Sequence, residues 1–157
     1  MISIQEQDFE LGAEYGLLRK TAGDAGAIAT FTGLVREIYD RSHVGDSKIS
    51  FLHLEHYPGM TEKNLQDIVD QANKRWSLLA TRLVHRIGHL YPGDQIVFVG
   101  TASEHRQDAF DAAQFIMDYL KNKAPFWKKQ GVGKSAVWVE STESDKAALS
   151  KWDAVST

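Results

Sequence analysis

The sequence predicts an α+β fold with a mixed, largely antiparallel sheet and two main helices. β-forming runs and helical runs interleave along the chain, but without the regular strand-helix-strand order of a parallel sheet. Two apolar stripes recur at helical spacing, and a Pro-Gly turn joins two neighbouring β-forming runs. The 157 residues contain no repeat, low-complexity tract or flexible linker, so we expect a single domain over residues 1–157.

The first predicted strand covers residues 26–35, which are apolar and rich in β-branched side chains. The polar residues 36–48 that follow have little to bury and are expected to form a mobile loop. A second strand is predicted over residues 49–57. It ends at Pro58 and Gly59, where the first main helix opens.

The first main helix is predicted from an apolar stripe that must pack against a sheet. The stripe consists of Leu65, Ile68, Val69, Ala72 and Trp76. After it, residues 79–87 and 95–101 are predicted to be strands, because both are strongly β-forming. The turn at residues 91–94 (YPGD) connects them.

The second main helix is predicted over residues 104–123, with Ser103 as its N-terminal cap and Pro125 ending it. Its buried stripe consists of Ala109, Ala113, Ile116, Met117 and Leu120. A last strand is predicted over residues 135–140. Residues 141–157 are expected to form a polar tail.

The composition excludes several classes of protein. Without cysteine there is no disulfide framework, no thiolate metal site and no cysteine nucleophile, and the chain suits a reducing cytoplasm. No apolar run approaches the roughly 18 residues that span a bilayer, and the N-terminus lacks the pattern of a signal peptide. The net charge of −3 argues against general nucleic-acid binding.

Positive charge is concentrated in one segment of this acidic chain. Between Tyr119 and Val139 there is no acidic residue. The same segment holds five lysines, Lys121, Lys123, Lys128, Lys129 and Lys134. Such an excess is typical of a site for an anion, and equally of a solvated helix end. The neighbouring Phe126 and Trp127 favour the site, because a half-buried amine loses basicity and can transfer protons or act as a nucleophile.

Two further groups of residues are candidates for binding. His105 and Arg106 lie in the first turn of the second main helix, where free backbone N–H groups attract anions. Arg36 stands where a buried strand meets a loop. The same pattern is equally typical of surface residues that have no function, and this interpretation stays open for all three residues. The strand histidines do not have zinc-ligand spacing, and we expect no metal site. They are His53, His56, His85 and His89.

Several short segments stand out in order along the chain: residues 31–36 (FTGLVR), 54–62 (LEHYPGMTE), 85–88 (HRIG), 92–94 (PGD), 96–100 (IVFVG), 105–106 (HR), 114–121 (QFIMDYLK), 124–129 (APFWKK) and 138–140 (WVE). Taken together, these segments resemble the family of the large, catalytic subunit of molybdopterin synthase. The resemblance runs from about residue 26 to residue 140. Residues 131–136 and the tail match poorly, so no function is assigned to them.

The resemblance implies an α/β-hammerhead fold and a homodimer that holds two small ubiquitin-like sulfur-carrier subunits, which makes a heterotetramer. Each carrier ends in Gly-Gly activated as a thiocarboxylate. Two sulfurs pass in turn to cyclic pyranopterin monophosphate and form the dithiolene of molybdopterin. The chain would then be a sulfurtransferase of molybdenum cofactor biosynthesis, with no cofactor, nucleic acid or membrane involved.

The resemblance also implies roles for individual residues. Lys121 corresponds to an essential lysine that holds the thiocarboxylate or the oxyanion of an intermediate, and Lys128 to a second lysine that transfers protons. The residues implied to bind substrate are Leu34, Val35, Arg36, His105, Arg106, Lys121, Lys128, Lys129 and Gln130. His105 and Arg106 are expected to come from the same chain or from the neighbouring subunit. Leu34 departs from relatives that carry lysine, which removes a side-chain contact there.

A different function stays open at this point. A non-catalytic module for RNA or single-stranded DNA would use the same lysines for charge and the aromatic pair Phe126 and Trp127 for stacking.

Overall fold

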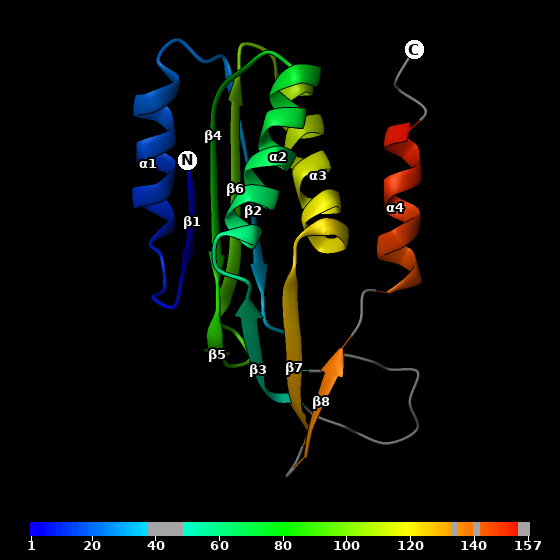
Figure 1. The fold of residues 1–157 in the computed structure, drawn as a ribbon. Coiled ribbons are helices and arrows are strands. Elements are labelled where there is room, and N and C mark those ends of the chain that lie inside the picture. Colours follow the sequence, from blue (N-terminus) through cyan, green and yellow to red (C-terminus); the bar gives the residue numbers. More distant parts are fainter. Residues whose placement is uncertain (38–48, 133–134, 140–141, 154–157) are drawn as a thin grey trace.

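A computed structural model describes residues 1–37, 49–132, 135–139 and 142–153, and it forms two sheets with helices on both faces of the larger one (Figure 1). The main sheet has the strand order β1 (Ile2–Gln5), β4 (Leu78–Arg86), β6 (Gln95–Ser103), β2 (Ala27–Leu34). Only β1 runs parallel to its neighbour, β4, and the other pairs are antiparallel. The mixed, largely antiparallel sheet is thus confirmed.

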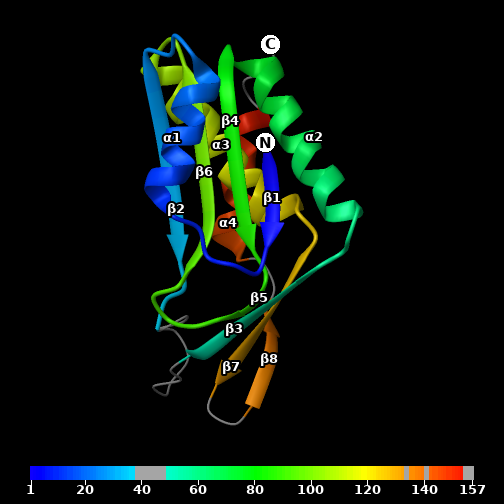
Figure 2. The same ribbon diagram turned by 90° about the vertical axis from the view of Figure 1, so that its left-hand side faces the viewer.

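The second sheet is smaller and lies beyond one end of the main sheet, at the bottom of Figures 1 and 2. Its strand order is β5 (Gly88–Leu90), β3 (Ile49–His56), β7 (Phe126–Val132), β8 (Ser135–Val139), and every pair is antiparallel. Because β7 follows the second main helix directly, residues near the end of that helix meet residues of the second sheet.

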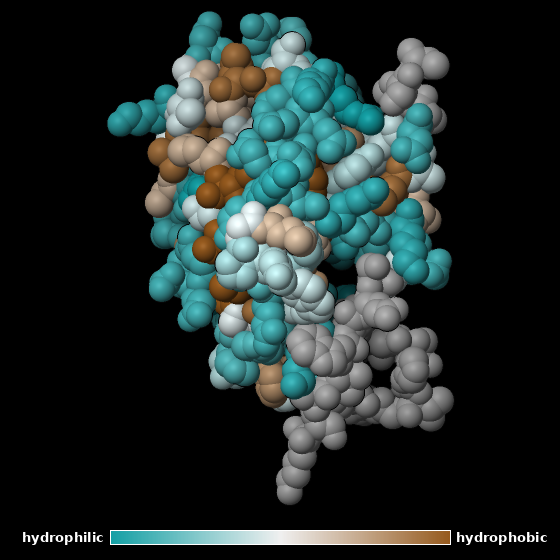
Figure 3. All heavy atoms as spheres, viewed as in Figure 1, coloured by the Kyte–Doolittle hydropathy of each residue, from teal (hydrophilic) through white to brown (hydrophobic). Residues whose placement is uncertain are grey.

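The helices form layers on the main sheet (Figures 1 and 2). Helix α1 (Leu11–Ala22) covers one face, and Leu18 and Ala22 pack there against Ala102 of β6. Helices α2 (Met60–Arg75) and α3 (Arg106–Lys123) cover the opposite face. Helix α4 (Glu143–Asp153) lies on α3. On the side seen in Figure 3, hydrophilic residues predominate over α2.

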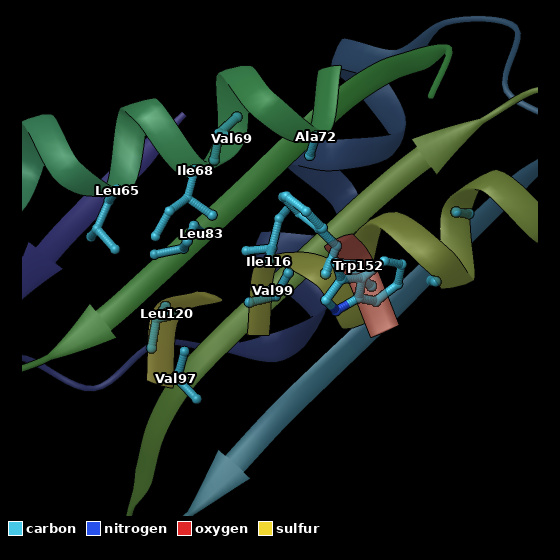
Figure 4. Packing of buried hydrophobic residues seen from close by; sticks show 14 residues of the cluster. Leu65, Ile68, Val69, Ala72, Leu83, Val97, Val99, Ile116, Leu120 and Trp152 are labelled. Carbon is cyan, nitrogen blue, oxygen red and sulfur yellow. The ribbon is translucent and has the colours of Figure 1, made fainter. Parts of the chain in front are cut away.

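The largest core cluster fills the space between the main sheet and α2 and α3 (Figure 4). The predicted stripe of α2 is confirmed for Leu65, Ile68, Val69 and Ala72, which are all buried. Trp76 lies just beyond the helix as its C-cap and is partly buried against the same cluster. Leu83 of β4 meets this cluster, whereas its neighbour Val84 packs on the other face with Phe9 and Phe98. This alternation is what a strand buried on both faces requires.

Most predicted elements are confirmed within one or two residues, but the predicted cap of α3 is wrong. Ser103 ends β6, and its hydroxyl donates a hydrogen bond to the Ser77 carbonyl at 3.0 Å. His105 is the N-cap residue and makes no side-chain cap bond. The hydrogen bond from Ser103 to the Ser77 carbonyl therefore outweighs the tendency of Ser103 to cap a helix, and α3 begins at Arg106.

The predicted polar tail contains a helix that belongs to the core. Trp152 of α4 is 7% exposed and packs edge-on against Trp76 and Phe115. Its Nε1 donates a hydrogen bond to Asp118 Oδ2 at 2.8 Å. α1 and α4 are thus two helices beyond the expected pair, and β1, β5 and β7 are strands beyond those expected. The rest of the predicted mobile loop, from residue 38, lies outside the described residues, as do Lys134 and Glu140.

Candidate active site

A cavity of about 740 Å³ lies where the two sheets meet the C-terminal end of α3. Its apolar wall includes Leu52, Leu54, Ile96, Val97 and Phe126. The charged groups lining it are Arg36, Lys121, Lys128 and Asp145. Among the described lining residues, three cations therefore face one carboxylate. This balance favours an anionic ligand.

Lys121 lies in the last turn of α3, at the rim of the cavity. Its side chain is 57% exposed, and Nζ lies 3.5 Å from Oδ1 of Asp145 in the first turn of α4. The backbone carbonyl of Asp145 accepts a hydrogen bond from Nδ2 of the adjacent Asn122 at 2.6 Å. The end of α3 and the start of α4 therefore hold a cation and a carboxylate next to each other.

Lys128 lies deeper, on β7, opposite Leu54 of β3. Paired residues of an antiparallel ladder share one face, and Leu54 belongs to a buried cluster, so this face is the cavity wall. Burial lowers the pKa of Lys128, and the charges of Lys121 and Arg36 lower it further, while Asp145 opposes them. Lys128 is therefore the cavity amine whose proton is held less tightly than usual.

Arg36 reaches the cavity because the chain before it is fastened to a turn. The backbone N–H of Val35 donates to the Asp94 carbonyl at 2.9 Å, and the N–H of Gly93 donates to the Val35 carbonyl at 2.8 Å. Gly93 has φ of +92°, which favours glycine at this position. Val35 is buried, whereas the side chain of Leu34 is exposed at the cavity.

Four of the predicted binding residues do not line this cavity. His105 and Arg106 stand at the N-terminal end of α3, and Arg106 is about 22 Å from Lys121 along the axis at 1.5 Å per residue. Lys129 alternates with Lys128 on β7 and so belongs to the other face. Gln130 is buried beside Leu52, and its Nε2 has no hydrogen-bond partner in the described structure.

The structure adds two titratable lining residues that the sequence analysis did not select for the site, Asp145 and His85. Asp145 had a local signal, since Thr142 and Asp145 form a reciprocal capping box with N–H to side-chain oxygen distances of 3.2 and 3.3 Å. The signal for His85 was weaker. It follows the two apolar residues Leu83 and Val84 of β4, and no other local pattern marks it.

The balance of charges predicts how Asp145 acts on Lys128. Asp145 raises the pKa of Lys128, so Asp145→Asn should lower that pKa. NMR titration of lysine amines in the variant and the unaltered protein measures the difference. An exposed lysine such as Lys20 on α1 serves as the internal reference. An unchanged or higher pKa of Lys128 would contradict this electrostatic account.

The chain can now be compared with known proteins. A family model described as MoaE protein matches residues 4–123, from β1 to the end of α3. The molybdopterin synthase catalytic subunit of Escherichia coli is 52% identical over 151 residues, which cover 96% of this chain and 97% of that protein. This chain belongs to the MoaE family. The match to the E. coli protein covers nearly the whole chain, although the MoaE model itself ends before Lys128.

Solved structures agree with the MoaE assignment. The molybdopterin biosynthesis MoaE protein of Burkholderia ambifaria is 44% identical, with a TM-score of 0.82 and coverage of 98% of this chain and 97% of that one. A molybdopterin synthase chain from Staphylococcus aureus is 30% identical, with a TM-score of 0.77 and coverage of 87% and 95%. The expected α/β-hammerhead fold class is thereby confirmed. Within the described part of this MoaE chain, no helix is long and apolar enough to cross a membrane.

Proposed function

We propose that this MoaE family chain is the catalytic subunit of a molybdopterin synthase. It transfers sulfur from the C-terminal thiocarboxylate of a small ubiquitin-like carrier to cyclic pyranopterin monophosphate, giving the dithiolene of molybdopterin. The observation that carries the proposal is the convergence of Arg36, Lys121 and Lys128 on one cavity. The reaction brings two anions together, a thiocarboxylate and a cyclic phosphate, and both need cationic partners.

Lys121 is suited to hold the carrier's reactive end. Its ammonium already lies 3.5 Å from a carboxylate oxygen of Asp145, so the rim of the cavity accommodates a carboxylate-like group. A thiocarboxylate has nearly the same shape and charge. An ammonium at this position stabilises either the bound thiocarboxylate or the oxyanion that forms when its carbonyl carbon is attacked.

Lys128 is suited to move protons. A general acid or base works best when its pKa lies near the working pH, and burial brings the pKa of Lys128 down from its ordinary value toward that range. Formation of each C–S bond at the pterin requires proton movements on the substrate. A half-buried amine in the cavity wall can supply or accept these protons.

Arg36 is suited to bind the phosphate of the pterin. A guanidinium group donates two parallel hydrogen bonds to phosphate oxygens, and Arg36 contributes this group from the end of β2. The cavity volume of about 740 Å³ lies within the usual range for small-molecule sites, roughly 300 to 1,000 Å³. It therefore has space for a pterin beside the end of a glycine tail. Leu34 and Val35 line the same wall.

We place His105 and Arg106 in the site of a second copy, within the proposed homodimer and heterotetramer. They stand about 22 Å along α3 from Lys121 and so do not reach the cavity of their own chain. A twofold dimer presents the same patch from both subunits. In such a dimer the N-terminal end of one α3 can lie at the cavity of the other copy. Lys129 and Gln130 were expected to line the same site, but neither lines the cavity of this chain, and no role is proposed for them.

Mixing two inactive variants tests this arrangement. Arg106→Ala and Lys121→Ala chains, unfolded and reassembled together, should recover about a quarter of the unaltered activity. Half of the dimers are then hybrids, and one of the two sites in each hybrid has both residues. Each variant refolded alone is the control. No recovery in the mixture would place Arg106 in the site of its own chain, and an Arg106→Ala chain that is active when refolded alone would place Arg106 outside the site.

The nucleic-acid alternative finds less support. It needs the lysines and both aromatic rings on one accessible surface, but strand alternation divides them between the two faces of β7. Phe126 shares the cavity face with Lys128, whereas Trp127 is 45% exposed and lies near Tyr57 on the other face.

We also propose that the protein works in the cytoplasm, where reducing conditions preserve a thiocarboxylate. Cell fractionation with detection of this chain tests the location.

Reconstitution tests the proposed function. The purified chain, a thiocarboxylated carrier and cyclic pyranopterin monophosphate should yield dithiolene, with two carriers consumed per product because each thiocarboxylate holds one sulfur. A carrier without its two terminal glycines should form no product yet still bind, because its folded body supplies most of the affinity. Absence of dithiolene with the intact carrier would refute the function.

A further inference from the structure

His85 occupies an unusual position for a titratable side chain. It lies near the end of β4, two residues after Leu83 and on the same face, where an apolar residue would continue the core. It is only 5% exposed, yet it lines the cavity that contains Lys121 and Lys128. A buried polar group in the wall of a reactive cavity calls for a chemical role.

The hydrogen bonding of His85 determines its tautomer. Nδ1 lies 2.8 Å from the backbone carbonyl oxygen of Arg86. Because a carbonyl oxygen only accepts, Nδ1 carries the proton of the neutral ring and Nε2 keeps a lone pair. Burial lowers the pKa of His85 to about 4, and the charges of Lys128 and His56 also act downward, against the bond to Arg86. At neutral pH the ring is therefore an uncharged acceptor.

The ring of His85 is also packed against the strand that carries Lys128. It stacks on Phe126 with a centroid distance of 3.9 Å and an interplanar angle of 15°. Phe126 and Lys128 alternate along β7 and so share one face. The residue before Phe126 is held as well, since the Pro125 carbonyl accepts a hydrogen bond from Thr61 Oγ1 at 3.1 Å. His85 and Lys128 are thus neighbours on one wall.

We propose that His85 is a positioning residue for the amine of Lys128: its ring holds the Phe126 ring on the shared face, and its Nε2 presents a hydrogen-bond acceptor to that amine. Its effect on sulfur transfer rests on the proposed function, whereas its effect on Lys128 does not. Other charged groups face Lys128 from three elements, namely Lys121 of α3, Asp145 of α4 and Arg36 after β2. His56 of β3 faces His85. Among these groups, the His85 ring is the one that offers a hydrogen-bond acceptor to Lys128 without carrying a charge.

Two substitutions separate the two contributions of the ring. His85→Phe keeps an aromatic ring to stack on Phe126 but removes the Nε2 acceptor. His85→Gln keeps an acceptor near the position of Nε2 but removes the stacked ring. His89→Phe is the matched control, because His89 is an exposed histidine that contacts the Phe51 and His53 rings away from the cavity lining.

The first measurement needs no substrate. Competitive acetylation of the free chain over a range of pH, read by mass spectrometry, gives the pKa of Lys128, with Lys20 as the internal reference. Loss of an acceptor destabilises the ammonium form, so His85→Phe should lower the pKa of Lys128 by about one further pH unit. His85→Gln should lower it less, and His89→Phe should leave it unchanged.

The second measurement is single-turnover sulfur transfer by the complex with thiocarboxylated carrier. His85→Phe should reduce the rate about tenfold without changing the KM for the carrier, because the misplaced group is the proton-transferring amine. A shifted Lys128 titration in a chain that transfers no sulfur at all would support the inference and refute the proposed function.

An unchanged Lys128 titration and rate in a folded His85→Phe protein would overturn the inference. If His85→Phe does not fold, the rate of His85→Gln decides, because this variant lacks the ring that stacks on Phe126. A reduced rate then supports the positioning role, whereas a rate and a Lys128 pKa both equal to those of the unaltered protein overturn it.

Discussion

Lys121→Ala is expected to reduce sulfur transfer at least about a hundredfold and to leave the fold intact. Removal of one group that stabilises an oxyanion typically costs a factor of about 100 to 1,000 in rate. Stability should change by less than about 1 kcal/mol, because the Lys121 side chain is more than half exposed and its ion pair with Asp145 is screened by solvent. Lys121→Ala should therefore change the rate of sulfur transfer strongly and the free energy of unfolding only slightly.

Single-turnover rates and the melting temperature, measured on the same preparations, test this expectation. Lys123→Ala is the matched control, since Lys123 is exposed in the same helical turn but does not line the cavity. It should behave like the unaltered protein in both measurements. A Lys121→Ala rate within twofold of normal would remove Lys121 from the catalytic step.

Lys128→Arg is expected to reduce sulfur transfer by about 100-fold or more, although it preserves the positive charge. The guanidinium group of arginine stays protonated at all working pH values, so it cannot take the part of an amine that gains and loses a proton. A merely electrostatic role for Lys128 would tolerate this exchange. The substitution therefore distinguishes proton transfer from simple attraction of anions.

The rate as a function of pH provides the second readout. In the unaltered protein, the pKa of Lys128 lies below its ordinary value of 10.5, so one limb of the profile should reflect an amine that deprotonates earlier than a free lysine. That limb should vanish in Lys128→Arg. Lys74→Arg, at the exposed end of α2, controls for the exchange of side chains. A normal rate and the same limb in Lys128→Arg would assign the proton transfer to another group.

The elements that could be predicted from sequence are those with a strong local pattern. The stripe of α2 and the apolar run of β6 each bury a continuous surface, so their periodicity survives in the linear sequence. Helix α4 buries mainly Trp152, and β7 has the sequence FWKKQGV, in which two lysines obscure a strand. Helix α4 and strand β7 form because they pack or pair with other elements of the fold. Their own sequences contain no pattern from which that packing could be predicted.

The candidate site follows the same division. Local charge excess and the aromatic pair marked the segment that holds the five lysines, and the family resemblance singled out Lys121 and Lys128 within it. The junction of strand and loop marked Arg36. Asp145 and His85 were not selected, because their importance depends on neighbours distant in sequence. Asp145 acts on Lys121, 24 positions earlier, and His85 stacks on Phe126, 41 positions later.

The sequence alone determined which residue types are available, the main periodic elements, and the resemblance to one family. It also determined that sulfur chemistry in this chain cannot use a cysteine of its own. Only the tertiary structure decided that Arg36, Lys121 and Lys128 share one cavity, and that His105, Arg106, Lys129 and Gln130 do not line it. The physical reason is that pKa values and ion pairs depend on distance and burial, which arise when separate elements pack together.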